Sequence, residues 1–139
     1  PELVHRKVYR DKRFTHFRLL SRALDRMKTA ESGKIVYSIL PRTVYLETGA
    51  NEEDNEGILD VMKALRGAEL FVLLRQVDAE RFKVSMRSTD YVSCSELARM
   101  FGGGGHARAS GFSRRGSVEK LGERIMRRII AKVREQAWI

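Results

Sequence analysis

The sequence predicts an α/β fold, with a small mixed β-sheet flanked by helices in a single domain that has an N-terminal connector helix. Segments whose apolar residues recur every three or four positions alternate with short β-branched and aromatic runs, as in a sheet covered by helices. The 139 residues, 42% of them hydrophobic, suffice for one domain with one core. No apolar run approaches the roughly 18 residues of a membrane span. A single cysteine, Cys94, excludes an internal disulfide bond, and we expect a cytoplasmic protein without a membrane partner.

The first half of the chain is predicted to contain a long helix, a strand and two further helical segments. Apolar residues at helical spacing predict an amphipathic helix over 12–29, with an apolar face of Phe14, Phe17, Leu20, Leu24 and Met27. The run 34–40 has the composition of a buried strand, and 43–50 that of one or two helical turns. The acidic start of 51–67 favours a helix N-terminus, and Gly67 favours its end. Its expected core residues are Ile58, Val61, Met62 and Leu65.

The second half is predicted to begin with an antiparallel hairpin of strands 69–77 and 81–88. The pattern S-x-x-E at Ser93–Glu96 is a capping box, which predicts a short helix that runs into four glycines. A last edge strand is expected over 109–115. The final helix is expected from Ser117 to about Gln136, with Leu121, Ile125, Ile129 and Val133 buried.

Charge is unevenly distributed along the chain, whose net charge is +9. Residues 1–30 carry 9 Lys and Arg against 3 Asp and Glu, residues 31–80 carry 5 against 10, and residues 81–139 carry 13 against 5. Two basic flanks around an acidic middle favour a polyanionic partner, such as nucleic acid or nucleotide phosphates. A well-solvated arginine-rich surface explains the same charges, so charge alone leaves both interpretations open.

The stretch FGGGGHARASGF, residues 101–112, is the first candidate site. Glycines let backbone N–H groups approach a ligand, and consecutive N–H groups can form an anion nest to which a following helix N-terminus adds positive charge. His106 at the rim of such a nest could donate to a phosphate or move a proton. The alternative is a flexible helix C-cap with a locally satisfied histidine. The stretch follows a helix and lacks a Lys-Ser/Thr pair, so it is neither a dinucleotide fingerprint nor a P-loop.

Arg87 and Ser88 are the second candidate site. Lys83, Ser85 and Arg87 alternate with apolar residues on the predicted strand 81–88 and therefore share its polar face. An arginine there could hold a phosphate in bidentate geometry, although a solvent-facing strand arginine is the commoner case.

The chain shows no complete catalytic centre of its own. Hydrolytic metal sites need several converging ligands, and His5, His16 and His106 are not paired at helical ligand spacing. Cys94 has no obvious activating base, so no nucleophile–base pair is evident. Pro1 stands where an initiator methionine would be, which leads us to expect a piece of a longer protein.

The segments KVSMRST (83–89) and SELARMFGGGGHARASGF (95–112) resemble the C-terminal substrate-binding domain of the DHH phosphoesterase superfamily. That domain has an Arg-Ser strand followed by a helix and the pattern G-G-G-H-x-x-A-x-G, which here runs from Gly103 to Gly111. The segment 47–74 is similar to the one that precedes these motifs in the oligoribonuclease (nanoRNase) and phosphoadenosine-phosphate phosphatase branch. The resemblance covers roughly residues 34–115.

The resemblance implies an enzyme with two lobes, of which the N-terminal one carries the DHH motif and a pair of divalent metals, usually manganese. No Asp-His-His triplet is present here, so residues 1–30 would be the connector helix, 31–139 the substrate-binding domain, and this chain would bind no metal. By the same resemblance Arg87 and Ser88 would contact substrate phosphate or base. The terminal phosphate would be wrapped by Gly103, Gly104 and Gly105, and His106 would face the reaction centre as a catalytic residue.

The resemblance gives no firm role to the acidic residues near position 55. The family often has Thr where this chain has Asn55, and Asn where it has Asp60. Helix N-terminal charges are therefore the favoured interpretation of Asp54, Glu56 and Asp60.

The function expected from the resemblance is that of a substrate-binding lobe, in a metal-dependent phosphoesterase acting on short single-stranded oligonucleotides or nucleotide phosphates. The isolated chain would bind substrate without cleaving it. Its partners would be the catalytic DHH lobe of the same parent chain and, in a homodimer, a second copy of the protein. A nucleic-acid-binding module, like those appended to alanyl-tRNA synthetase and single-strand exonucleases, is the alternative that the basic final helix favours. Cyclic-dinucleotide hydrolysis also remains open.

Overall fold

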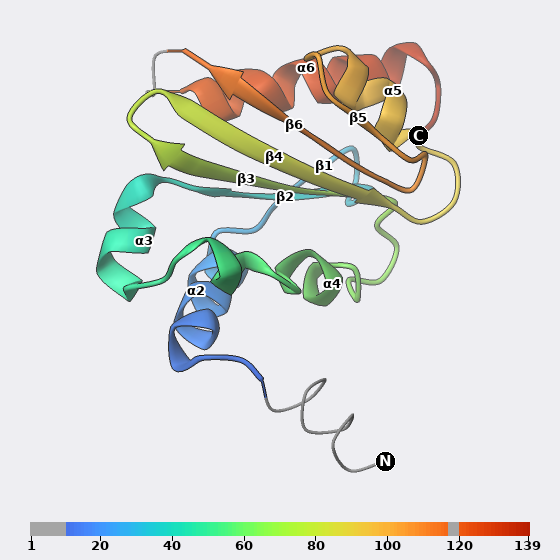
Figure 1. The fold of residues 1–139 in the computed structure, drawn as a ribbon. Coiled ribbons are helices and arrows are strands. Elements are labelled where there is room, and N and C mark those ends of the chain that lie inside the picture. Colours follow the sequence, from blue (N-terminus) through green and yellow to red (C-terminus); the bar gives the residue numbers. More distant parts are fainter. Residues whose placement is uncertain (1–10, 117–119) are drawn as a thin grey trace.

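The computed structural model describes residues 11–116 and 120–139 as a six-stranded mixed sheet between two layers of helices (Figure 1). The strand order is β1-β2-β3-β4-β6-β5. Strands β2 and β3 run parallel, and the other neighbouring pairs run antiparallel. The predicted α/β fold with a small mixed sheet is confirmed.

The elements alternate along the chain as the sequence patterns indicate. The helices are α2 (Phe14–Asp25), α3 (Arg42–Thr48), α4 (Ile58–Met62), α5 (Cys94–Arg99) and α6 (Leu121–Glu135), with a 3-10 turn η1 (Glu52–Asn55). The strands are β1 (Lys28–Ala30), β2 (Ile35–Leu40), β3 (Leu70–Asp78), β4 (Arg81–Ser88), β5 (Gly104–Gly105) and β6 (Ala109–Arg115). Within the described residues, no helix has the length and apolar character needed to cross a lipid bilayer.

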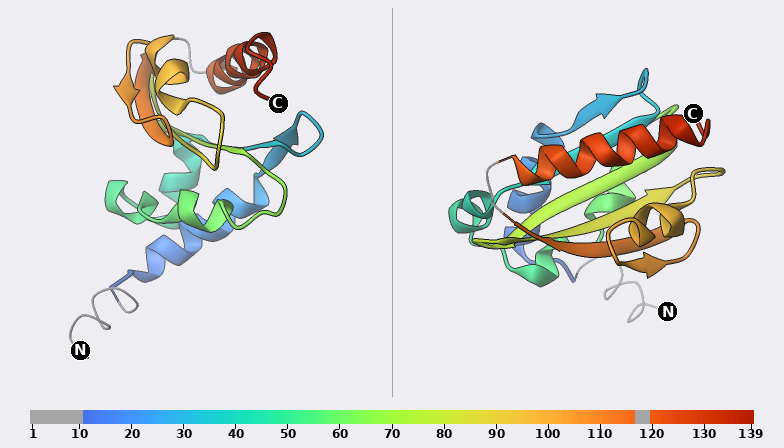
Figure 2. Two further views of the ribbon diagram at one scale, coloured as in Figure 1. Left: turned by 90° about the vertical axis from the view of Figure 1, so that its right-hand side faces the viewer. Right: turned by 90° about the horizontal axis from the view of Figure 1, so that it is seen from above.

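The two faces of the sheet are covered by different helices. Helices α5 and α6 cover one face, and α2, α3, η1 and α4 lie against the other, as Figure 2 shows from the side. Strand β3 is buried on both faces, with Leu70 and Val72 toward α5 and α6, and Phe71 and Leu73 toward α2 and α4. This double burial explains why its sequence is a continuous apolar run rather than an alternating one.

Strand β4 is buried on one face only. Phe82, Val84 and Met86 lie in the core beneath α5 and α6, whereas Lys83, Ser85 and Arg87 on the opposite face are only half-buried. The layer formed by α2, α3 and α4 therefore covers β2 and β3 but leaves this face of β4 partly open. The predicted alternation along 81–88 is confirmed, and it defines where a ligand could reach the sheet.

The predicted helix over 12–29 is too long, because residues 28–30 form the edge strand β1. α2 ends at Asp25, and the chain then pairs antiparallel with β2 through a turn in which Glu31, Ser32 and Gly33 have left-handed backbone. The predicted apolar face is correct in part, because Leu20, Leu24 and Met27 pack against the core. The residues buried on α2 are His16, Leu19 and Ala23, whereas Phe14 and Phe17 are 71% and 53% exposed.

The predicted single helix over 51–67 is divided into η1 and α4. Asn51 and Asp54 form a reciprocal capping box that closes η1 as one tight turn. Glu56 is then extended and Gly57 left-handed (φ 88°), and this backbone cannot continue a helix. Of the expected core residues there, Ile58 and Met62 are buried, but Val61 and Leu65 are exposed.

Two further predictions concern the C-terminal third. Strand β6 is not an edge strand, because β5 pairs with its outer side at Gly104 and Gly105. Helix α6 begins at Leu121 and ends at Glu135, and the expected start at Ser117 lies outside the described residues. Its predicted core residues are all buried.

Candidate functional site

The uncovered half of the sheet brings the two predicted sites onto one surface. Arg87 of β4 lies directly opposite Ala109 of β6, and Ala109 exchanges two backbone hydrogen bonds with His106 (2.7 and 3.2 Å). Residues directly opposite each other in antiparallel strands share a face of the sheet. We call this surface the open face; it comprises Lys83, Ser85, Arg87, Gly104, His106, Ala109, Gly111 and Ser113.

The first of the four glycines ends helix α5. Gly102 is left-handed (φ 79°), its N–H donates to the Arg99 carbonyl, and the N–H of Gly103 donates to the Ala98 carbonyl at 2.9 Å. These two bonds form a Schellman motif, in which glycine is the usual left-handed residue. Gly102 therefore caps helix α5.

The remaining glycines allow β5 to lie close against β6. A Cβ at Gly103 would stand 2.3 Å from the Gly111 carbonyl oxygen, and one at Gly105 would stand 2.7 Å from the Ala109 carbonyl oxygen. A Cβ at Gly104, in contrast, would meet no atom within 4 Å. Gly104 is therefore the exposed glycine whose missing side chain leaves free space on the open face.

The predicted anion nest has only part of its donors available. The N–H groups of Gly103 and His106 donate to Ala98 and Ala109 carbonyls, so they are used within the chain. The segment after His106 is strand β6 rather than a helix, so the expected helix N-terminus beside the nest is wrong. A phosphate contact by Gly103, Gly104 or Gly105 stays a prediction.

Arg87 and Ser88 lie on opposite faces of β4. Arg87 is half-buried, and its guanidinium donates one hydrogen bond to the Met86 carbonyl at 2.9 Å. Ser88 is buried, and its Oγ donates one bifurcated hydrogen bond, shared between the Val92 carbonyl at 2.6 Å and the Ala107 carbonyl at 3.2 Å. Because Ala107 lies at the tip of the β5–β6 hairpin, Ser88 fastens the segment that carries His106.

Glu69 is a structural residue of the site that the sequence analysis missed. Its buried carboxylate accepts hydrogen bonds from three consecutive N–H groups of the loop that follows Arg87 and Ser88. The donors are Asp90 (2.8 Å), Tyr91 (3.0 Å) and Val92 (2.8 Å). A charged residue at the start of a fully buried strand is the sequence signal that could have identified it.

A groove of about 460 Å³ adjoins the open face, between β3 and β4 on one side and the η1–α4 segment on the other. Ser85 and Arg87 line it together with Arg75, Asn55, Glu56 and Asp60. The carboxylate of Glu52 pairs with Arg75 and lies 3.8 Å from the ammonium of Lys83. Among the described residues, Arg87 has no carboxylate within ion-pair distance, so its guanidinium is available to an anionic ligand.

Asp54 is engaged in the fold rather than exposed in the groove. Arg13 donates to its carboxylate at 2.6 Å, and Thr15 Oγ1 and the Asn51 N–H both donate at 2.9 Å. The hydrogen bonds from Arg13, with those from Asn51 and Thr15, lower the pKa of Asp54 from 3.8 to about 2. Its interpretation as a capping charge at a helix N-terminus is confirmed.

Neither metal ligands nor an activated thiol are assembled here. In the part of the chain that the structure describes, no three His, Cys, Asp or Glu residues are placed to hold a metal ion. Cys94 is fully buried at the start of α5, and burial raises the pKa of its thiol. The residues of the open face can bind and orient an anion, and His106 can donate a hydrogen bond to it.

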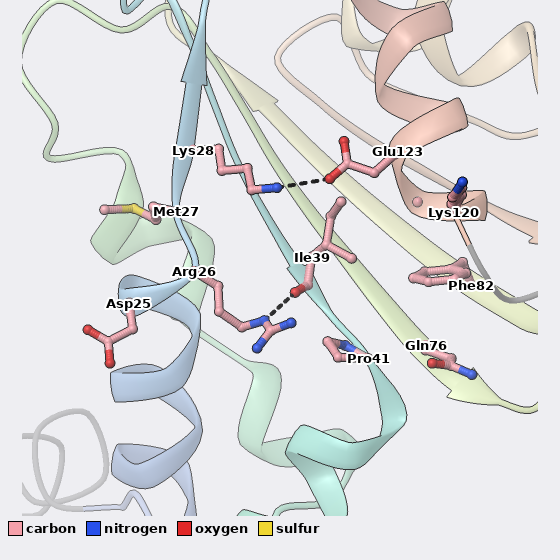
Figure 3. A pocket seen from close by; sticks show the side chains of 11 residues that line it. Asp25, Arg26, Met27, Lys28, Ile39, Pro41, Gln76, Phe82, Lys120 and Glu123 are labelled. Carbon is pink, nitrogen blue, oxygen red and sulfur yellow. Dashed lines mark hydrogen bonds and ion pairs between the residues drawn. The ribbon is translucent and has the colours of Figure 1, made fainter.

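A second cavity of about 460 Å³ lies between the end of α2, the end of β2 and the first turn of α6 (Figure 3). Two of the cations that line it are already engaged: Lys28 pairs with Glu123 at 3.0 Å, and Arg26 donates to the Ile39 carbonyl at 2.9 Å. None of the predicted site residues lines it. We therefore place the candidate site at the open face.

A half-covered mixed sheet with an available arginine, an exposed histidine and a glycine-rich edge defines the chain as a small α/β domain with a candidate anion-binding surface. Residues 32–135 match the model of the DHHA1 domain family, and the chain belongs to that family. The resemblance carried by the motifs at 83–89 and 95–112 is thereby confirmed.

Relatives and solved structures agree with this assignment. The chain is 31% identical over 126 residues to the bifunctional oligoribonuclease and PAP phosphatase NrnA of Thermus thermophilus, covering 90% of this chain and 36% of that protein. An exopolyphosphatase-related protein from Bacteroides fragilis has a TM-score of 0.86 at 26% identity, over 97% of this chain and 39% of that one. The C-Ala domain of Aquifex aeolicus alanyl-tRNA synthetase shares the fold, with a TM-score of 0.53 at 14% identity, over 74% of this chain and 95% of that domain. The chain thus spans little more than a third of the first two proteins.

Proposed function

We propose that this chain is the substrate-binding domain of a metal-dependent phosphoesterase and holds the phosphates of short single-stranded oligonucleotides or nucleotide phosphates. The observation that carries the proposal is the open face, where the available guanidinium of Arg87 and the exposed ring of His106 flank Ala109. The relationship to a protein named as an oligoribonuclease and PAP phosphatase supports this substrate class.

Three residues of the open face, Arg87, Gly104 and His106, have a task in the proposed binding. Arg87 supplies a planar fork of donors that matches a phosphate in bidentate geometry. Gly104 leaves room for the ligand to approach the backbone, and His106 donates to a phosphate oxygen or holds a proton at its ring nitrogen. Ser88 and Glu69 act indirectly, by fixing the hairpin and the loop around the site.

The groove beside Arg87 supports a short substrate rather than a long one. Three carboxylates of the η1–α4 segment, Glu53, Glu56 and Asp60, line it. Glu53 pairs with Arg13 at 3.4 Å, whereas Glu56 and Asp60 have no ion-pair partner among the described residues. One or two phosphates can be held by Arg87, but further phosphates in the groove would meet like charge.

We place the metal outside this chain. The described residues present no ligand set that fits a divalent metal. We propose that manganese, the metal implied by the family, is bound by a DHH lobe of the same parent chain. This chain alone then binds substrate without cleaving it.

Calorimetric titration of this chain with a 5′-phosphorylated dinucleotide tests the proposal. We expect Arg87→Gln to weaken binding at least tenfold, and the wild-type affinity to fall with salt with a slope near 0.7 for each phosphate held. Arg66→Gln is the matched control, because Arg66 is an exposed arginine away from the open face. Equal affinities for wild-type and Arg87→Gln chains would show that the site is wrongly placed.

A second candidate function is a nucleic-acid-binding module appended to another enzyme. It is favoured by arginines on α6 that the open face does not use. Dinucleotide hydrolysis by the parent protein separates the two candidates. If the chain is a substrate-binding lobe, Arg87→Gln and His106→Ala should lower the rate of hydrolysis. If it is an appended module, the parent protein should not hydrolyse dinucleotides.

A further inference from the structure

A second cluster of arginines lies on the opposite side of the sheet from the open face. At the end of α5, Phe101 stacks on Phe112 of β6, with ring centroids 4.2 Å apart and planes 7° from parallel. The guanidinium carbon of Arg128 lies 4.5 Å from the Phe101 ring centroid, and that of Arg114 lies 5.6 Å from it. The two guanidinium carbons are therefore no more than about 10 Å apart.

Two more arginines extend this cluster along α6. Arg124 lines a small cavity of about 130 Å³ together with Phe101, Arg114 and Arg128. Arg127 and Arg128 follow Arg124 at the spacings i+3 and i+4, which place all three on one side of the helix. We call the resulting surface the arginine patch; it comprises Arg114, Arg124, Arg127 and Arg128.

Within the described part of the chain, no carboxylate compensates the charges of the arginine patch. Across residues 11–116 and 120–139, none of its four guanidinium groups lies within 4.0 Å of an Asp or Glu oxygen. Basic residues nearer the end of the same helix differ in this respect, since Arg134 pairs with Glu31 and Lys132 with Glu135. Four like charges held close together repel one another, and an anionic partner would relieve that repulsion.

The geometry of the patch favours a phosphate chain over a lipid surface. The aromatic ring orients two guanidinium groups in advance, so less side-chain entropy is lost when they bind phosphate. The apolar residues beneath them, Phe101, Leu121 and Ile125, are only 6%, 7% and 2% exposed. No apolar side chain among these is available for insertion into a membrane, whereas several phosphates along a strand can each meet a guanidinium.

We propose that the arginine patch is a second binding site, which holds the phosphate backbone of single-stranded nucleic acid independently of its sequence. It lies on the α5–α6 side of the sheet and is separate from the open face, so it goes beyond the binding of a short substrate. A strand too short to reach the patch would be held by the open face alone.

Fluorescence anisotropy with a labelled 20-nucleotide oligouridylate tests this proposal. The variant Arg114→Gln/Arg124→Gln/Arg128→Gln should bind the strand at least tenfold more weakly, and the slope of log affinity against log salt should fall by about 2, since each phosphate contact on a single strand contributes about 0.7. The matched control Lys34→Gln/Lys63→Gln/Arg66→Gln removes the same charge from exposed positions elsewhere and should keep the wild-type slope.

Glutamine keeps two of the three side-chain methylene groups of arginine, and an unchanged near-ultraviolet circular dichroism spectrum would show that the triple variant is folded. On the wild-type chain, the oligouridylate should shift the amide NMR signals of Phe101, Arg114 and α6. Dinucleotide binding should be the same in wild-type and triple-variant chains, which separates this proposal from that for the open face. Equal losses in the test and control variants, no shifts at the patch, or binding of anionic vesicles but not of the oligouridylate would each overturn it.

Discussion

Gly103 and Gly104 of the β5–β6 hairpin differ in the space available for a side chain, so alanine at each position should change stability by a different amount. Gly103→Ala places a Cβ against the Gly111 carbonyl and Phe112, so we expect unfolding by urea to show a loss of about 1–3 kcal/mol. Gly104→Ala should change stability by less than about 0.5 kcal/mol, because its Cβ would enter open space. If the open face is the binding site, Gly104→Ala nonetheless weakens dinucleotide binding.

Two outcomes would contradict this assignment. Equal stability losses in Gly103→Ala and Gly104→Ala would show that β5 does not lie as close to β6 as the structure has it. Unchanged dinucleotide affinity in Gly104→Ala would remove Gly104 from the open face as a ligand contact.

Asp54 predicts a specific dependence of stability on pH. Its folded-state pKa of about 2 lies below the ordinary value of 3.8, so its contribution is complete well above pH 4 and is lost as the pH falls from about 4 to 2. Asp54→Asn should therefore lower the free energy of unfolding by about 1–3 kcal/mol at pH 7, with a smaller difference at pH 2. Urea titrations at stepped pH measure this, with the exposed Asp60→Asn as control. A constant difference between pH 7 and pH 2 would rule out the ionised carboxylate as its cause.

The residues that could be predicted are those governed by local rules. Gly102 is identified by the end of a short helix, and the polar face of Arg87 by alternation along a strand. The same alternation places Ser88 on the other face of the strand. The family resemblance, in contrast, assigned Ser88 to the substrate contact together with Arg87. The partners of Glu69 and Arg75 could not be assigned, because they lie in segments distant in sequence.

At the scale of elements, the buried carboxylate of Glu69 organises the loop 89–92. Glu69→Gln replaces one acceptor oxygen by a donor NH₂ group that faces backbone N–H groups, so we expect a loss of about 1–3 kcal/mol. Amide hydrogen exchange should become faster at Asp90, Tyr91 and Val92. The exposed Glu80→Gln serves as control. Unchanged exchange in the loop, even with lowered global stability, would show that Glu69 does not hold it.

Helical spacing and charge did not predict where two of the helices end. The predicted helix over 12–29 ends early because residues 28–30 gain sheet pairing with β2, a tertiary interaction that helical spacing does not reveal. The division of 51–67 follows from the capping box of Asn51 and Asp54 and from the left-handed Gly57. In both segments the acidic or apolar pattern was consistent with a helix. Sheet pairing ended the first helix early, and local backbone preferences divided the second.

At the scale of the whole molecule, one sheet is shared by two cores, and this predicts cooperative unfolding. Leu19 of α2 is fully buried in the core on one side of the sheet, and Trp138, the single tryptophan, packs against the core on the other side. Leu19→Ala should cost about 2–5 kcal/mol. Because β2 and β3 contribute to both cores, neither core can persist once the sheet separates.

The measurement is urea unfolding followed by tryptophan fluorescence and by far-ultraviolet circular dichroism. Fluorescence reports the α5–α6 side, and circular dichroism reports all helices and strands. We expect the two transitions to coincide in the wild-type chain and to move together to lower urea in Leu19→Ala. The surface substitution Ser21→Ala on the same helix should leave both midpoints in place. A fluorescence midpoint that stays constant in Leu19→Ala while the circular dichroism midpoint falls would mean that the two layers unfold separately.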